Sequence, residues 1–333
     1  MALAQGKEKE MVRMSFSIRV KAELIGRLSD SCCQMAELSA ITHTGGSLSI
    51  SSRGLSAEVT TSSALLAERV ASLFEALYGV KGEVYSEQKS SLKKNVLYTV
   101  KVPELSERIL LELGIISFDG SNHRQIVEGI DPYLAEQGCC KVSYLAGAFL
   151  ACGSVSVPEA AKGKNLGYHL GFSLSNEKMA QDVRQLLSHF NIAAKIARKK
   201  SGFTVYLKEG EGIADFLALV GASKCVLELQ EIMVEREVKN NTNRQTNCIL
   251  ANIDRSVSAA VRQIEAINLI DKKIGLNSLP QSLSYVARLR RQHPDLSLEA
   301  IASLSGGKLT KSGINHRMRK IIDIARTLEQ DSK

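Results

Sequence analysis

Two stretches of the chain share one order of hydrophobic and polar positions, with a period of about 110 residues. The first begins CCQMAELSAITHTGGSLSI (32–50) and the second CCKVSYLAGAFLACGSVSV (139–157). Each is a pair of adjacent cysteines followed by an apolar helical pattern that ends in Gly-Ser. In both copies the next segment has apolar positions three and four residues apart, which predicts an amphipathic helix.

The remainder of each copy follows the same order. Short strand-like runs, VLYTVKV (96–102) and FTVYLKE (203–209), precede a short helix that ends at Gly114 or at Gly221, where glycine indicates a C-cap. Each copy therefore reads helix, strands, helix, strands, helix. Two such copies predict an α+β fold with pseudo-twofold symmetry, in which the first helices of the copies meet at the axis. Small side chains would let these helices approach closely: Ala36, Ser39, Ala40, Ala146, Gly147 and Ala148.

The pattern changes after Gly221. An apolar helical stripe there runs into an Asn-rich polar stretch, and a further helical pattern ends at Gly275. These features predict a helical linker to a terminal module. The expected organisation is an N-terminal extension without fixed structure (1–13), two repeats (14–120 and 121–221), the linker (222–276) and an all-α domain (277–333).

Three helices are predicted in the terminal module. The first, QSLSYVARLRRQ, should stop before Pro294 because a residue that precedes proline disfavours helical backbone. The second has Ser297 as its N-cap. Gly306 and Gly307 then supply a tight turn in which positive φ costs little. The second helix is expected to bury Leu298, Ile301 and Leu304.

The third predicted helix, TKSGINHRMRKIIDIARTLE, has one apolar and one basic face. Its apolar face carries Ile314, Met318, Ile321, Ile322 and Ala325. Its other face carries the candidate DNA-binding residues Lys311, Ser312, Asn315, His316, Arg317, Arg319 and Lys320. A short helix, a glycine turn and a longer basic helix are typical of a helix-turn-helix, in which Asn can read adenine, Arg can read guanine, and Lys and Ser hold phosphates. The alternative is a surface helix with a solvated charge run.

The charge distribution favours the DNA-binding interpretation. The net charge is +8, and residues 280–333 hold ten Lys or Arg against five Asp or Glu, a net +5. A basic terminal segment attracts a phosphate backbone. The scarcity of aromatic residues (5%, with no Trp) argues against a stacking platform for single strands. No apolar run reaches the roughly 18 residues of a membrane span, and the polar N-terminus lacks a secretory signal, so a cytoplasmic, nucleoid-associated protein without membrane contact is expected.

Other chemical constellations are weak in the sequence. The seven cysteines include no CxxC pair, so they are expected to pack as buried thiols, with no metal site. The six histidines are scattered, and no Gly-rich phosphate loop is present. No cofactor and no enzymatic activity are therefore predicted.

Four segments resemble the WhiA family of bacterial regulators: YLAGAFLACGSVS, YLKEGEGIADFLALVGAS, NRQTNCILANIDRSVSAAVRQI and LTKSGINHRMRKI. The resemblance extends over nearly the whole chain from Met14. It implies a degenerate LAGLIDADG homing-endonuclease-like domain joined to a C-terminal helix-turn-helix. It also implies a double-stranded DNA-binding, transcriptional role in cell division, chromosome segregation and, in sporulating lineages, sporulation.

The resemblance also addresses nuclease activity. LAGLIDADG enzymes bind their divalent metal with the acidic residue before the final glycine of each motif, and these positions are Gly45 and Cys152 here. An active homing endonuclease is therefore the less favoured alternative. A second alternative is a cell-division or nucleoid protein that acts mainly through a protein partner or as a homodimer. Candidate accessory DNA contacts are Arg288, Arg290, Arg291, Lys93, Lys94, Arg198, Lys199 and Lys200, and the alternative for those in the repeats is a solvated charged face.

Overall fold

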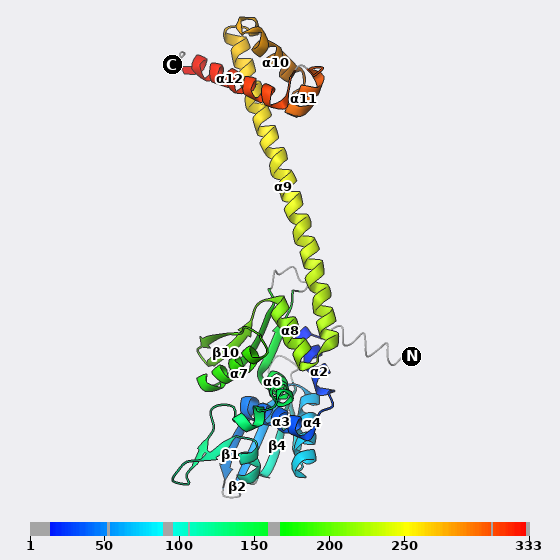
Figure 1. Ribbon diagram of the computed structural model, residues 1–333, viewed down its shortest axis with the longest axis vertical. Coiled ribbons are helices and arrows are strands. Elements are labelled where there is room, and N and C mark those ends of the chain that lie inside the picture. The colour runs from blue at the N-terminus through cyan, green and yellow to red at the C-terminus, as the bar shows by residue number, and fades with distance from the viewer. Residues whose placement is uncertain are drawn as a thin grey trace, which may run out of the picture. The chain divides into compact units, whose positions relative to one another are not determined.

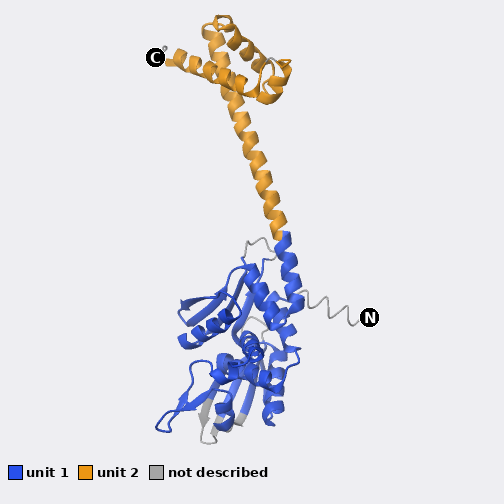
Figure 2. Cartoon of the chain, in the orientation of Figure 1, with its two compact units in different colours: residues 1–235 blue, residues 236–333 orange. Residues whose placement is uncertain are grey.

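The computed structural model describes residues 14–51, 54–88, 96–105, 107–158, 167–307 and 309–330. The chain divides into two compact units, residues 1–235 and residues 236–333 (Figure 2). Among the helices of the described residues, none combines the length and the apolar composition that a membrane crossing requires.

Two four-stranded antiparallel sheets with the same strand order form the first unit. The order is β1-β2-β4-β3 in one sheet and β7-β8-β10-β9 in the other. This equivalence confirms the internal repeat. The strands are β1 (Gly46–Ser51), β2 (Gly54–Thr61), β3 (Glu83–Gln88), β4 (Val96–Leu105), β7 (Gly153–Ser156), β8 (His169–Leu174), β9 (Lys195–Lys199) and β10 (Gly202–Leu207).

The helices of the first unit also occur in matching pairs. They are α3 (Ser31–Gly45) with α6 (Gly138–Cys152), α4 (Ala64–Tyr78) with α7 (Glu177–His189), and α5 (Glu107–Glu112) with α8 (Gly210–Val220). Asn176 caps α7 by accepting a 2.7 Å hydrogen bond from the Met179 amide. Gly221 has left-handed backbone (φ 88°) after α8, as its predicted C-cap role requires.

Helices α3 and α6 pack against each other at the centre of the first unit (Figure 1). A Cβ atom on Gly147 would lie only 2.5 Å from the Glu37 carbonyl oxygen, so the two backbones are in close contact. All six small residues predicted to permit this approach are buried. The expected meeting of the first helices of the two copies is therefore confirmed.

Short elements join the two copies and precede them. Helix α2 (Phe16–Ile25) comes before α3, and the 3-10 helix η1 (Pro132–Ala135) comes before α6. Strands β5 (Ile116–Phe118) and β6 (Arg124–Ile126) form a hairpin. The expected boundary between residues 120 and 121 lies in the turn of this hairpin, so the two sides of that boundary pair with each other.

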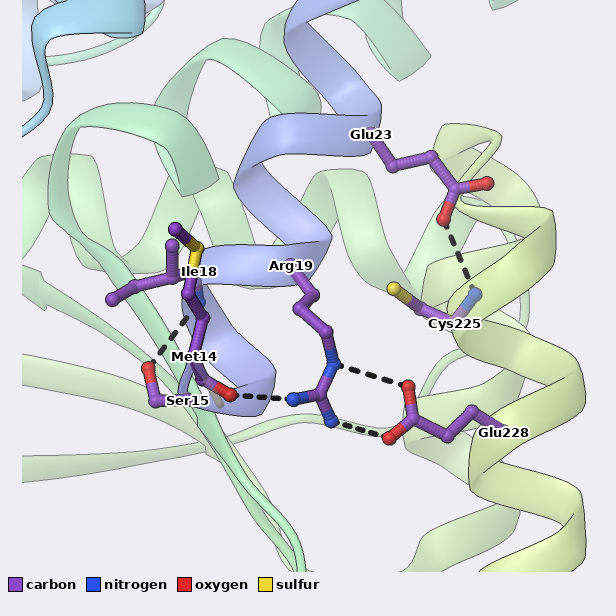
Figure 3. A network of polar contacts seen from close by, with 7 residues as sticks. All are labelled: Met14, Ser15, Ile18, Arg19, Glu23, Cys225 and Glu228. Carbon is purple, nitrogen blue, oxygen red and sulfur yellow. Dashed lines mark hydrogen bonds and ion pairs between the residues drawn. The ribbon is translucent and has the colours of Figure 1, made fainter. Parts of the chain in front are cut away.

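The predicted linker is one continuous helix, α9 (Ser223–Lys273). Its first turn is anchored on α2, where the Glu23 carboxylate accepts hydrogen bonds from the amides of Lys224 at 2.9 Å and Cys225 at 3.2 Å. Arg19 of α2 forms an ion pair with Glu228, as Figure 3 shows. A carboxylate at a helix N-terminus satisfies free amides and is favoured by the helix dipole.

The second unit is all-helical. It contains η3 (Leu276–Ser278), α10 (Gln281–Gln292), α11 (Leu298–Leu304) and α12 (Lys311–Gln330). Its apolar core also includes Ala266, Ile267 and Ile270 from the last part of α9. The end of α9, which precedes the expected boundary at residue 277, thus supplies part of the core of the second unit.

Candidate nucleic-acid interface

Helices α11 and α12 and the turn between them have the local geometry that the sequence predicted. Ser297 caps α11 by accepting a 3.1 Å hydrogen bond from the Ala300 amide. Gly306 (φ 62°) and Gly307 (φ 79°) have left-handed backbone in the turn. Thr310 then accepts a 3.1 Å hydrogen bond from the Gly313 amide at the start of α12. The helix-turn-helix thus forms from caps and glycines that are visible in the sequence.

One apolar row of α12 packs into the core of the module. Ile314, Met318, Ile321 and Ala325 are buried, and Ile322 is half-buried. On α11, Ile301 is buried and Leu298 is half-buried. Leu304 was expected in the core, but it is 52% exposed. Leu304 is the last residue of α11, directly before the turn, so this one core expectation is wrong.

The opposite face of α12 carries a polar row. At about 100° per residue, Ser312, His316 and Arg319 lie away from the buried row, and Lys320 lies beside them. The side chains of all four are exposed, whereas that of Asn315, at the edge of the row, is half-buried. Because a recognition helix presents to DNA the face opposite its core contacts, this row is the candidate reading surface.

Arg317 differs from the other predicted DNA-binding residues. It lies beside the buried row, on the side away from Asn315, and its side chain is half-buried. Its guanidinium donates a 3.2 Å hydrogen bond to the Gly313 carbonyl oxygen, one turn earlier in the same helix. The sequence pattern grouped Arg317 with Asn315, but the structure places the two residues on opposite sides of α12.

The exposed cations of α12 have different surroundings. Lys311 forms a 3.3 Å ion pair with Glu299 of α11. Arg319 and Lys320 have no ion pair with any residue in the described part of the chain. These two residues therefore present uncompensated positive charge on the candidate reading surface.

The three arginines of α10 were all expected as accessory DNA contacts. Arg288 is exposed and hydrogen-bonds Asn277. Arg291 is exposed and forms a 2.5 Å ion pair with Asp271, which lowers the pKa of that carboxyl. Arg290 is only 3% exposed and donates to the Leu296 carbonyl oxygen, and burial lowers its pKa. A phosphate cannot reach a guanidinium buried in this way, so the expectation for Arg290 is wrong.

The two degenerate metal positions lie at equivalent helix ends. Gly45 is the last residue of α3 and Cys152 the last of α6. A Cβ atom on Gly45 would lie 2.9 Å from the Ala151 Cβ, so this end of the helix pair is also tightly packed. The Cys152 thiol donates to the Ala148 carbonyl oxygen at 3.2 Å, and burial raises its pKa to about 11. Neither position offers the carboxylate oxygen that a hard divalent cation requires.

Family models match three parts of the chain. They are the WhiA N-terminal LAGLIDADG-like domain over residues 31–116, the WhiA LAGLIDADG-like domain over residues 141–239 and the WhiA C-terminal HTH domain over residues 242–325. A protein of Bacillus cereus (strain AH187), named "Probable cell division protein WhiA", is 42% identical over 95% of this chain and 97% of its own length. The chain belongs to the WhiA family.

Two further comparisons extend over the whole WhiA architecture. A protein of Brevibacillus brevis (strain 47) with the same name is 39% identical over 94% of this chain and 96% of its own length. The crystal structure of full-length DUF199/WhiA from Thermatoga maritima superposes with a TM-score of 0.55 at 29% identity. It covers 94% of this chain and 99% of that one. The predicted fold class, two LAGLIDADG-like α/β repeats followed by a helix-turn-helix region, is therefore confirmed.

The two sheets of the WhiA repeats differ in the charge of their open faces. Strand alternation places Lys195, Lys199 and Tyr206 on the open face of the second sheet. On the first sheet the equivalent face carries Glu58 and Glu83 opposite Lys101. The second sheet is therefore the more basic of the two.

Three of the five expected accessory contacts of the repeats lie in the described part of the chain. Arg198, Lys199 and Lys200 are exposed at the end of the β9–β10 hairpin. The pKa of His169 on the same sheet is lowered by burial and by the charges of Lys199 and Lys208. Lys93 and Lys94 lie outside the described residues.

The cysteine pairs have an arrangement in this WhiA protein that the sequence pattern did not predict. Cys33 and Cys140 are buried as expected, but Cys32 and Cys139 are exposed. The four sulfur atoms all lie within 4.8 Å of one another. Burial raises the pKa of the Cys140 thiol to about 12. The expectation of buried thiols is wrong for Cys32, Cys139 and Cys248. The two pairs occupy equivalent places in two helices that meet at a pseudo-twofold axis. The internal repeat was therefore the feature of the sequence from which their contact could have been predicted.

Proposed function

We propose that this protein is a non-catalytic, sequence-specific regulator of transcription that binds double-stranded DNA through α12. One observation carries the proposal: α12 buries an apolar row in the helix-turn-helix core and exposes a basic, hydrogen-bonding row on its opposite face. A major groove admits a helix, and its base pairs present distinct donors and acceptors to such side chains. Membership of a family with a C-terminal HTH domain supports the same conclusion.

The position of each side chain on α12 suggests its role. Asn315, His316 and Arg319 are assigned to base edges, since Asn suits adenine, Arg suits guanine, and all three lie on or beside the exposed row. Ser312, Lys311 and Lys320 are assigned to phosphates, for which a hydroxyl or an ammonium suffices. Arg317 is assigned to stabilising α12 through Gly313 instead of reading DNA.

Neighbouring elements supply accessory contacts in this proposal. Arg288 and Arg291 are exposed on α10, where they can strengthen attachment to the DNA backbone. In the LAGLIDADG-like repeats, we assign accessory contact to Arg198, Lys199 and Lys200 of the more basic sheet. The acidic residues on the open face of the other sheet would repel phosphates.

The curated relatives are named "Probable cell division protein WhiA". We infer a role for this chain in cell division, at the nucleoid, with chromosome segregation and, in sporulating lineages, sporulation as related processes. Catalysis is not part of the proposal, because Gly45 and Cys152 supply no metal-binding carboxylate. Purified protein should leave a supercoiled plasmid intact in the presence of Mg²⁺ or Mn²⁺. Metal-dependent cutting would contradict the assignment.

Selection of bound fragments from sheared genomic DNA at physiological salt tests the proposal. Intact protein should enrich a discrete motif, and an Asn315→Ala/Arg319→Ala variant should lose it. Arg317→Ala, on the opposite flank of the same helix, is the matched control and should retain the motif. Loss of the motif in the control together with retention in the double variant would contradict the assigned reading face. Absence of a motif with intact protein would favour action through a protein partner.

A further inference from the structure

The N-terminal ends of α3 and α6 bring four cysteines together. Cys32 and Cys33 are the second and third residues of α3, and Cys139 and Cys140 are the second and third residues of α6. The helices pack together along their length, so their first turns lie side by side at one end of the pair. Each helix has 15 residues, which places this cluster about 20 Å from the degenerate positions at the other end. It is therefore separate from the site that homing endonucleases use.

The spacing of the sulfur atoms matches the coordination shell of a single metal ion. The two adjacent pairs have Sγ–Sγ distances of 4.0 Å for Cys32–Cys33 and 3.9 Å for Cys139–Cys140. All four sulfurs lie within 4.8 Å of one another. Four thiolates at about 2.3 Å from a tetrahedral zinc ion are about 3.8 Å apart. If the sulfur–sulfur distances shortened by a few tenths of an ångström, and by up to about 1 Å for the widest pair, they would match those of a tetrahedral zinc site.

We propose that Cys32, Cys33, Cys139 and Cys140 bind one zinc ion, which joins the two LAGLIDADG-like repeats at their pseudo-twofold axis. Each repeat contributes two ligands, so the closed four-thiolate shell forms only when both repeats are folded together. A shell of four protein ligands leaves no open position for water or substrate, which makes the site structural and not catalytic.

Burial of Cys33 and Cys140 opposes ionisation of their thiols, whereas the helix ends at the cluster favour metal-bound thiolates. The N-cap residues Asp30 and Gln137 make no side-chain cap hydrogen bond, so no cap side chain occupies the amides of either first turn. The positive ends of two helix dipoles stabilise negative sulfur at this position. Buried Ser143 lies one helical turn after Cys139 on the same face of α6, in the place of an outer-shell residue that orients a ligand.

The ligand set selects among metals. Four thiolates are soft ligands, unsuited to Mg²⁺ or Ca²⁺, which prefer oxygen. An iron–sulfur cluster distributes its thiolates over different iron atoms, which requires them to lie farther apart than around one ion. A single tetrahedral zinc ion fits the compact arrangement best.

Metal analysis of the full-length chain tests the proposal. Protein purified under reducing conditions from zinc-supplemented cells, and then desalted, should contain about one zinc ion per chain by elemental analysis. Replacement of zinc by Co²⁺ should give the sulfur-to-metal charge-transfer and tetrahedral ligand-field absorption of a thiolate site. Both signals should be lost in the Cys32→Ser/Cys139→Ser variant, which changes the two exposed ligands. Cys248→Ser, an exposed cysteine on α9, is the matched control and should retain both.

A second measurement does not depend on any variant folding. Cys32, Cys139 and Cys248 are all exposed, so a thiol reagent should modify all three in chelator-treated wild-type protein. After zinc is restored, Cys32 and Cys139 should become protected while Cys248 remains reactive. Equal reactivity with and without zinc would overturn the proposal. A zinc content far below one ion per chain after anaerobic reconstitution would also overturn the proposal. An intact mass lowered by two hydrogens for each disulfide would do the same, because it would show that the four cysteines form disulfides.

Discussion

The Gly147 Cα of α6 lies so close to the Glu37 carbonyl oxygen of α3 that a Cβ atom there would be 2.5 Å away from it. Real Cβ atoms essentially never come this near to backbone oxygen, and the obstacle belongs to another helix, not to a flexible side chain. The contact fixes how closely the two central helices of the first unit can pack. A glycine is therefore needed at this place for a steric reason.

We expect Gly147→Ala to lower the free energy of unfolding of the first unit by about 1–3 kcal/mol, because the added methyl group forces the packed helices apart. Denaturant titration followed by circular dichroism measures the change. Gly212→Ala in α8 is the matched control, since nothing lies within 4 Å of the Cβ position there. The control should be stabilised by up to about 1 kcal/mol, as expected for alanine in an open helical position. Equal effects of the two changes would refute the steric argument.

Arg290 and Arg288 of α10 should respond in opposite ways to alanine. Loss of the buried Arg290 side chain removes its hydrogen bond to Leu296 and its packing, which should lower the free energy of unfolding of the second unit by about 1–3 kcal/mol. The folded fraction should bind DNA as wild type does. Loss of exposed Arg288 should change stability by less than about 0.5 kcal/mol but weaken DNA binding. Thermal unfolding and DNA titration on the same samples distinguish the two, and weaker binding by folded Arg290→Ala protein would contradict the assignment.

His43 near the end of α3 should make stability depend on pH. Its Nε2 lies 2.6 Å from the Val127 carbonyl oxygen, and burial lowers its pKa from 6.5 despite that contact and the charge of Asp182. Below pH 6.5 the unfolded chain therefore binds a proton that the folded chain does not, so the free energy of unfolding falls as the pH drops through that value. Denaturant titrations between about pH 7.5 and pH 5 measure this fall.

Substitution should locate the source of this pH dependence. His43→Gln should flatten the profile, whereas the exposed His316→Gln should leave it as in wild type. An unchanged slope in His43→Gln protein would show that other groups cause the pH dependence.

Lys320 provides a test of the phosphate assignments on α12. Each phosphate contact releases condensed counterions, so Lys320→Ala should reduce the slope of log affinity against log salt concentration by about 1. It should weaken binding to specific and nonspecific DNA alike. Fluorescence anisotropy at several salt concentrations measures both effects. An unchanged slope, or a loss confined to the specific site, would assign Lys320 to base reading.

Local signals in the sequence predicted much of the terminal module. The end of α10 at Gln292 follows from Pro294, and the start of α11 follows from the hydroxyl of Ser297. These features depend on residues a few positions apart. Leu304 and Arg290 were assigned wrongly because helical periodicity gives a direction around a helix and not the depth of the neighbouring core. Leu304 ends its helix beside an open turn, whereas Arg290 reaches back to the Leu296 carbonyl oxygen.

Contacts between distant segments were harder to predict. The contribution of Ile267 and Ile270 to the core of the second unit depends on where α9 ends, and nothing in the local pattern separates linker from core within one continuous helix. The cysteine cluster combines residues from two repeats, and its adjacent pairs match no familiar metal-binding spacing. The repeat symmetry predicted the contact between α3 and α6. Applying that symmetry residue by residue would have placed Cys33 near Cys140.

The central helix pair has a consequence for synthesis on the ribosome. Helix α3 is buried from Ala36 to Thr42, and much of its covering comes from α6, which begins only at Gly138. A nascent chain that has emerged through the first sheet therefore still exposes the helix at the heart of its future core. Long-range contacts of this kind slow folding and leave apolar surface open to aggregation. The two repeats, alike as they are, should behave as one cooperative folding unit, and a chain cut between them should not yield two stable halves.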